Sequence, residues 1–240
     1  VVQVGCDVRG SRWAAEVAAA HGSVHAAVAL HPNEAPRIVH GGAGPRGERA
    51  PGGAAALDAA LAEIDRLAGL DQVKAVGESG LDYFRTGAEG EAAQQRSFRA
   101  HIEIAKRHGK ALVIHDRDAH GDVLRILKEE GAPERTVFHC YSGDAEMAQV
   151  CAAQGYYMSF AGNVTFKNAA PLRAALAVAP LDLVLVETDA PFLTPAPYRG
   201  RPNAPYLIPV TVRAMAEVKG VGEEAMAAAV SANTARAFGY

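Results

Sequence analysis

Short apolar runs alternate with segments of helical periodicity along nearly the whole chain, and this alternation limits the possible folds more than any other feature. It indicates parallel strands joined by crossover helices, and runs with few polar residues indicate a sheet covered on both faces. The seven expected strands are residues 1–7, 24–32, 73–80, 111–117, 136–143, 156–162 and 183–190. The expected helices are 11–21, 54–69, 90–108, 119–130, 144–154, 168–178, 206–219 and 223–237, with N-caps such as Ser11, Ser142 and Asn168.

Polar side chains gather at the carboxyl ends of these expected strands. They are Cys6, Asp7, His31, Glu78, His115, His139, Ser159, Glu187 and Asp189. A doubly wound sheet would use mainly one switch point, whereas a closed barrel brings all strand ends to one centre. We therefore predict an α/β protein with a TIM-type (β/α)8 barrel that lacks its first βα unit, forming one domain over residues 1–240. The glycine-rich segment 40–53 is expected to be a mobile surface loop.

Composition narrows the classes of function. The formal net charge is -3 and the pI is about 6.3, which excludes a basic nucleic-acid footprint over the whole chain but not a local basic patch. No apolar run has the length needed to cross a membrane, and three cysteines without metal-finger spacing suit a reducing compartment. We expect a cytoplasmic protein without a leader, not bound to membranes and monomeric.

Four of the strand-end residues form a candidate metal site: Glu78, His115, His139 and Asp189. Two imidazoles and two carboxylates suit Zn²⁺, Mn²⁺ or Fe²⁺ and are acceptable for Mg²⁺. Such a site activates water for hydrolysis of an ester, phosphoester or amide without a serine or cysteine nucleophile. Cys140 is expected to point away from His139 because successive strand residues face opposite sides.

Six motifs, in order and spread along the chain, resemble the TatD family of metal-dependent hydrolases in the amidohydrolase superfamily. They are "AVGESGLDYFR" (75–85), "VIHDRDA" (113–119), "HCYSG" (139–143), "SFAGNVTFKN" (159–168), "LVETDAPFLTPAPYRGRPN" (185–203) and "NTARAF" (233–238). The resemblance implies a barrel with one or two divalent ions (Mg, Mn or Zn) and deoxyribonuclease activity that trims DNA from 3′ to 5′. It makes Glu78 the shared ligand and a catalytic residue, assigns His115 and His139 to the second cation, and makes Asp189 a ligand of the first cation and the general base, with Glu187 in support.

The resemblance has one departure. The family opens with a His-x-His pair on its first strand, and this sequence contains no such pair. We expect the sequence to begin after the first βα unit; the alternative is a degenerate member that has lost half of its site.

The expected partner is DNA, as single strands or 3′ ends. The residues expected to bind it are His31, Arg117, Ser142, Arg199 and Arg201, and a packing role for His31 is equally open. Tyr83, Phe84 and Tyr198 could stack on unpaired bases. Two alternatives stay open: an amide or lactone hydrolase of the same superfamily, and a binding protein with a vestigial site.

Overall fold

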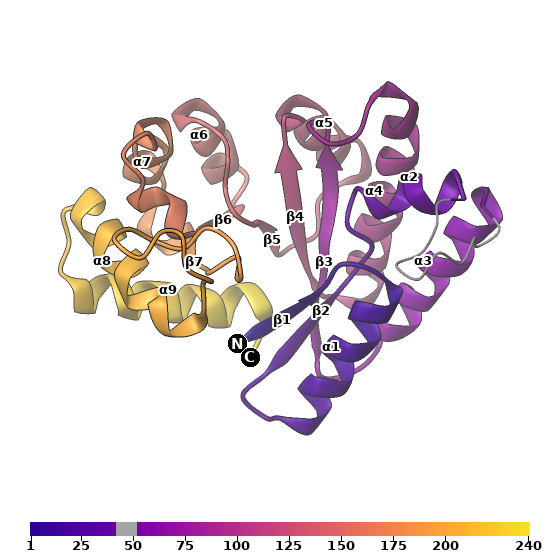
Figure 1. Ribbon diagram of the computed structural model, residues 1–240, viewed down its shortest axis with the longest axis horizontal. Coiled ribbons are helices and arrows are strands. Elements are labelled where there is room, and N and C mark those ends of the chain that lie inside the picture. Colours follow the sequence, from indigo (N-terminus) through magenta and orange to yellow (C-terminus); the bar gives the residue numbers. More distant parts are fainter. Residues whose placement is uncertain (42–51) are drawn as a thin grey trace. The chain divides into compact units, whose positions relative to one another are not determined.

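The computed structural model describes residues 1–41 and 52–240, which form two compact units. The first unit comprises residues 1–136 with Gly239, and the second comprises residues 137–238 with Tyr240. Each unit combines strands with covering helices (Figure 1). Most of the segment expected to be a mobile loop, residues 42–51, lies outside the described residues.

The strands of the first unit are parallel, and they pair in the order in which they occur in the sequence. They are β1 (Val2–Gly5), β2 (His25–Val28), β3 (Val73–Asp82) and β4 (Ala111–Arg117). Parallel neighbours need crossover connections, which contain α1 (Val8–Ala20), α2 (Glu34–Val39), α3 (Ala54–Ala68) and α4 (Ala88–His108). α5 (His120–Glu130) follows β4. The six residues of α2 are too few to show a helical period, so the sequence does not predict this helix.

The second unit repeats the same scheme with shorter strands. Its strands are β5 (Thr136–Phe138), β6 (Tyr157–Phe160) and β7 (Val184–Val186), and both β5–β6 and β6–β7 are parallel. Its helices are α6 (Ala145–Ala153), α7 (Ala170–Val178), α8 (Ile208–Lys219) and α9 (Glu223–Phe238). The described residues thus contain the seven strands that the sequence predicts.

The predicted ends of two strands and the predicted N-caps of the helices are wrong. β5 and β7 end several residues before the predicted limits at 143 and 190, because the backbone turns as soon as the polar residues begin. The predicted N-caps Ser11, Ser142 and Asn168 are also wrong. The carboxylate of Asp7 accepts the amide hydrogen of Gly10 at the start of α1, Asp144 caps α6, and Ala169 is the N-cap of α7. Ser11 instead lies buried within α1 and bonds the backbone of Ala29.

One helix, α4, supports the strand ends of the first unit. Phe98, Ile102 and Ala105 recur on one face at helical spacing and are buried. The same face carries two fully buried polar residues, Gln94 and His101. Both bond backbone groups that lie at or beyond the ends of strands β2 and β3, so α4 holds the segments from which the candidate site is built.

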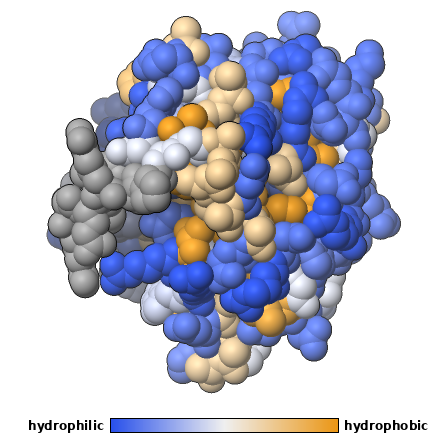
Figure 2. Space-filling view, turned by 90° about the vertical axis from the view of Figure 1, so that its right-hand side faces the viewer, coloured by the Kyte–Doolittle hydropathy of each residue, from blue (hydrophilic) through white to orange (hydrophobic). Residues whose placement is uncertain are grey.

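The face of the molecule that Figure 2 shows is mainly hydrophilic, and its apolar residues gather mostly in a band across the centre of the view. In the part of the chain that the structure describes, no helix combines the length and hydropathy needed to span a membrane.

Candidate functional site

Glu78 lies in an irregular part of β3. The register of β3 against β4 shifts around this residue, as in a β-bulge, which bends a strand and redirects its side chains. Two glycines permit the close approach of β4. A Cβ on Gly77 would lie 2.4 Å from the Cβ of Val113, and a Cβ on Gly80, whose φ is +142°, would lie 2.0 Å from the carbonyl oxygen of His115. The glycines of the "GESG" motif therefore place Glu78.

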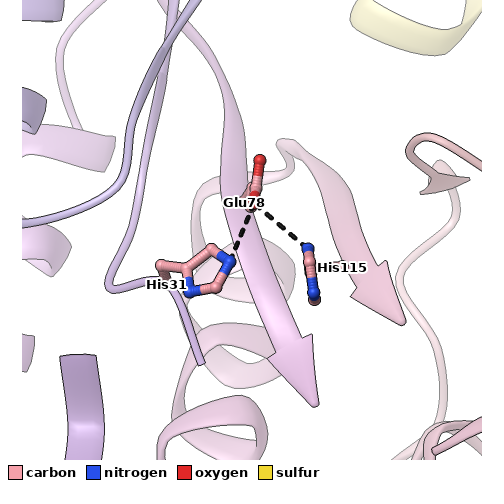
Figure 3. A group of neighbouring side chains, drawn as sticks. All are labelled: His31, Glu78 and His115. Carbon is pink, nitrogen blue, oxygen red and sulfur yellow. Dashed lines mark ion pairs between the residues drawn. The ribbon is translucent and has the colours of Figure 1, made fainter. Parts of the chain in front are cut away.

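Two histidines converge on Glu78 from neighbouring segments (Figure 3). His31 follows β2, and His115 lies on β4. His31 Nε2 lies 3.1 Å and His115 Nδ1 lies 3.2 Å from the same oxygen, Oε1 of Glu78. The two rings meet edge to face with centroids 4.6 Å apart. All three side chains are largely shielded from solvent.

A buried carboxylate, Asp82, lies on the other side of His115. Asp82 Oδ2 lies 3.3 Å from His115 Nε2 and accepts a hydrogen bond from Asn33 Nδ2 at 3.0 Å, while Oδ1 accepts the amide hydrogen of Arg85 at 2.9 Å. Gln94 fixes the backbone of Asp82 by accepting its amide hydrogen at 2.8 Å and donating to its carbonyl at 3.1 Å. Burial by itself raises the pKa of Asp82, but these bonds outweigh burial and hold that pKa well below its usual range.

The partners of His115 determine which ring nitrogen is available to a metal. A carboxylate 3.3 Å from Nε2 favours the neutral tautomer that carries its proton on that nitrogen, and this tautomer presents an unprotonated Nδ1 to Glu78. Two electron-rich atoms 3.2 Å apart repel each other unless a cation neutralises them. Ordinary zinc–nitrogen and zinc–oxygen bonds at a tetrahedral angle separate two ligand atoms by roughly 3.3 Å. The observed separation therefore fits a divalent cation.

The second unit contains a comparable group on turns that follow β5 and β7. His139 Nδ1 lies 2.8 Å from Glu187 Oε1, and the same oxygen accepts the amide hydrogen of Cys140 at 3.0 Å. Asp189 completes the group, because one potential ligand atom from each of His139, Glu187 and Asp189 lies within 4.8 Å of the others. Cys140 and Asp189 have φ angles of 43° and 56°, in the left-handed region that favours glycine. Backbone strain of this kind clusters at functional sites.

A buried side chain fixes the turn that carries Asp189. Asn203, which is 5% exposed, donates from Nδ2 to the carbonyl oxygens of Thr188 at 2.7 Å and Phe192 at 2.8 Å. Its backbone amide donates to the carbonyl of Pro191 at 3.0 Å. Three bonds from one residue therefore define the path of the chain on both sides of Asp189.

The predicted metal ligands are divided between these two groups. Glu78 and His115 belong to the first, and His139 and Asp189 to the second. The structure adds His31 to the first group and Glu187 to the second, and these are the groups of metal-ligand type found within residues 1–41 and 52–240. Both combine imidazole with carboxylate donors, which suit Zn²⁺ and Mn²⁺. A common site with one or two ions stays a prediction.

The predicted substrate-binding residues lie on loops and strand ends. The guanidinium of Arg117 lies 3.8 Å from the centre of the Phe84 ring, and that of Arg199 lies 4.1 Å from the centre of the Phe166 ring. Such cation–π pairs leave guanidinium hydrogens directed outward. The other two loop residues, Ser142 and Arg201, are exposed.

The prediction that Cys140 points away from His139 rests on the alternation of side chains along a strand, and this basis is wrong. β5 ends at Phe138, so His139 and Cys140 lie in a turn and strand alternation does not reach them. The sequence also gives no signal for the supporting residues Asn33 and Asn203, because their partners lie far away along the chain. Asp82 carries a weak signal, since it ends β3 four residues after Glu78.

Comparisons with known proteins extend over the whole chain. The sequence model of the TatD related DNase family matches residues 1–239. An uncharacterized metal-dependent hydrolase TatD from Mycobacterium tuberculosis is 42% identical over all of this chain and 85% of its own length. The uncharacterized metal-dependent hydrolase YcfH from Escherichia coli is 44% identical over 73% of this chain and 66% of its own length.

Solved structures extend the likeness to the fold. The crystal structure of YjjV, a TatD homologue from Escherichia coli, has a TM-score of 0.85 and 25% identity, covering 100% of this chain and 86% of its own. A TatD family hydrolase from Entamoeba histolytica has a TM-score of 0.79 at 17% identity, covering 99% of this chain and 83% of its own, which shows the fold alone. The predicted fold class, α/β of TIM type, is confirmed.

Proposed function

Because this chain belongs to the TatD family of metal-dependent hydrolases, we propose that its substrate is DNA and that it removes nucleotides from 3′ ends by hydrolysis of phosphodiester bonds. The observation that carries this proposal is the pairing of a histidine with a supporting carboxylate in both groups. Asp82 lies 3.3 Å from His115, and Glu187 lies 2.8 Å from His139. Carboxylate–histidine pairs of this kind orient metal ligands and fix their tautomers.

The roles of the chain's own residues follow from these contacts. A bound divalent cation lowers the pKa of water and neutralises charge on the phosphodiester. Glu78 and His115 supply oxygen and nitrogen donors in the first unit, and His139 and Asp189 supply them in the second. Glu187 receives the Nδ1 hydrogen of His139, which leaves Nε2 unprotonated.

Asp189 serves as general base in this proposal. Its carboxylate accepts a proton from the attacking water as the water oxygen bonds to phosphorus and the bond from phosphorus to the leaving oxygen breaks, and the leaving oxygen takes a proton from solvent. Asn203 holds the backbone on both sides of Asp189. A base held in this way needs little rearrangement before it acts, which is how positioning lowers a barrier.

The cation–π pairs support a single-stranded polyanion as substrate. Phe84 is 61% exposed and stacks with Arg117, so its outer face and the guanidinium together offer a base-stacking surface and a phosphate contact. Arg199 over Phe166 provides a second pair of the same type. The chain has few such contacts and a net charge of -3. We therefore expect it to bind single-stranded DNA modestly, with a strong dependence on salt and without sequence preference.

The test uses single-stranded DNA labelled at the 5′ end, which turns 3′-to-5′ trimming into a descending ladder. The protein is incubated with Mg²⁺ or Mn²⁺, with and without chelator, beside His139→Ala and the surface control His21→Ala. We expect a ladder that chelator and His139→Ala both abolish and that His21→Ala leaves intact. Cleavage insensitive to chelator, or unchanged in His139→Ala, would defeat the metal mechanism. Immediate release of the labelled 5′ nucleotide would defeat the proposed direction.

A further inference from the structure

The two histidines beside Glu78 have different hydrogen-bond partners. His31 Nδ1 accepts the backbone amide hydrogen of Asn33 at 3.1 Å, whereas His115 Nε2 faces the carboxylate of Asp82. A backbone amide nitrogen only donates, so Nδ1 of His31 must use its lone pair there. The single proton of the neutral ring is then on Nε2, the atom that lies 3.1 Å from Glu78 Oε1.

We propose that His31 is not a metal ligand but a fixed hydrogen-bond donor to the Glu78 carboxylate, and that Asn33 is the positioning residue that imposes this role. A metal-bound imidazole needs an unprotonated nitrogen. On His31 one nitrogen is occupied by the Asn33 amide and the other carries the proton directed at Glu78. On His115, by contrast, the unprotonated Nδ1 faces Glu78.

Asn33 is itself held in one orientation by neighbouring side chains. Its Oδ1 accepts the hydroxyl hydrogen of Thr86 at 2.8 Å, which directs Nδ2 toward Asp82 Oδ2 at 3.0 Å. A second donor to Oδ1, Gln94 Nε2, lies at 3.4 Å. Asn33 therefore contacts His31 through its backbone and the carboxylate that holds His115 through its side chain.

Other arrangements of the His31 ring lose these contacts. A ring turned by 180° would present carbon to both Asn33 and Glu78, so the hydrogen bond from the Asn33 amide and the 3.1 Å contact with Glu78 would both be lost. A ring protonated on both nitrogens would place two hydrogens against each other at Asn33. The arrangement observed satisfies the Asn33 amide and gives Glu78 Oε1 a donor, so the carboxylate has a preferred orientation before any cation binds.

This inference deepens the metal site on which the proposed function rests, but its test does not need hydrolysis. The ring nitrogens are observed by long-range ¹H–¹⁵N correlation at pH 8 in the metal-free protein and again with Zn²⁺ as a diamagnetic probe. We expect His31 to be protonated at Nε2 in both spectra, while the Nδ1 signal of His115 moves on addition of zinc. The proposal is overturned if His31 is protonated at Nδ1, or if its Nε2 proton is lost when zinc binds.

A matched pair of variants gives an independent measurement. In His31→Gln the side-chain amide keeps a donor near the position of Nε2 but is a poor zinc ligand, and His31→Leu has neither property. Zinc dissociation constants are measured by competition with a chromophoric chelator, and folding is checked by circular dichroism. We expect His31→Gln to remain within about threefold of the parent and His31→Leu to bind about tenfold more weakly or worse. Equal weakening in both variants would identify His31 as a ligand and overturn the proposal. A chain that binds zinc in this way but leaves DNA intact would contradict only the proposed function.

Discussion

In each of the two metal-ligand groups a histidine ring faces a supporting carboxylate, but the ring nitrogen that faces the carboxylate differs between the groups. In the first unit a carboxylate faces Nε2 of His115 and leaves Nδ1 to a cation. In the second unit a carboxylate faces Nδ1 of His139 and leaves Nε2. The supporting carboxylates also differ, because Asp82 is buried in a network of side chains at the end of strand β3, whereas Glu187 lies partly exposed on a turn. A histidine–carboxylate pair can therefore be held in place by packed strands, as in the first unit, or by turns that single side chains fix, as in the second.

The largest effect is expected from two substitutions that test whether both metal-ligand groups take part in hydrolysis. Glu78→Gln and Asp189→Asn each remove one negative oxygen without changing shape, and we expect each to lower kcat/KM on single-stranded DNA by about 10³-fold or more. Asp58→Asn, which removes an exposed carboxylate paired with Arg96, serves as control and should have no effect. Full activity in either Glu78→Gln or Asp189→Asn would show that only one group matters.

The second prediction concerns backbone packing in the first unit. In Gly80→Ala the new Cβ would lie 2.0 Å from the carbonyl oxygen of His115, at a φ of +142°. We expect unfolding to become easier by about 3 kcal/mol or more, since both strain and overlap must be relieved. The fluorescence of Trp13, the only tryptophan and a residue of the first unit, reports the urea midpoint.

Gly155→Ala is the matched control in the second unit. Its φ is +72°, but nothing lies within 4 Å of the added Cβ, so we expect a loss of only about 1 kcal/mol. Equal losses in the two variants would mean that the close approach of β3 and β4 contributes nothing beyond the local backbone conformation.

Much of the fold could be predicted because its signal is local. The parallel strands and the longer helices follow from apolar runs and periodicity, and Glu78, His115, His139 and Asp189 are found because each ends or follows a run. Glu187 is predicted in a supporting role, whereas the supporting asparagines could not be predicted. Asn203 bonds a segment more than ten residues away, and Asn33 meets Asp82 across 49 positions of sequence, so these contacts exist only once the strands have been placed.

The third prediction concerns pH and a buried histidine of the first unit. His101 Nε2 accepts the amide hydrogen of Leu30, next to His31, and Nδ1 lies 2.7 Å from the carbonyl of Ser97. Burial lowers the pKa of His101 from 6.5 to about 4, although the bond to Ser97 raises it. Between those values the unfolded chain binds more protons, so this contribution to stability is complete above pH 6.5 and is lost as the pH falls toward 4.

The expected loss from His101 is about 3 kcal/mol over this range. Urea midpoints followed through Trp13 between pH 7 and pH 4 measure it. His101→Gln should have a flatter pH dependence than the parent, whereas the exposed control His21→Gln should keep the parent's slope. An unchanged slope in His101→Gln would assign the acid sensitivity of the first unit to its carboxylates.

The smallest expected effect compares the two cation–π pairs. Arg117→Gln and Arg199→Gln each remove a proposed phosphate contact, and a single contact contributes about 1 kcal/mol, so we expect KM for single-stranded DNA to rise about fivefold with little change in kcat. Removal of one such contact should also lower the slope of log KM against log salt by about 0.7. Arg125→Gln is the control, because Arg125 is paired with Asp122 and Glu129 on the surface. An effect of Arg117→Gln alone would assign the bound phosphate to the first unit, and an effect of Arg199→Gln alone would assign it to the second. If both match Arg125→Gln, neither pair contacts the substrate, because a phosphate contact cannot be removed without changing the salt dependence.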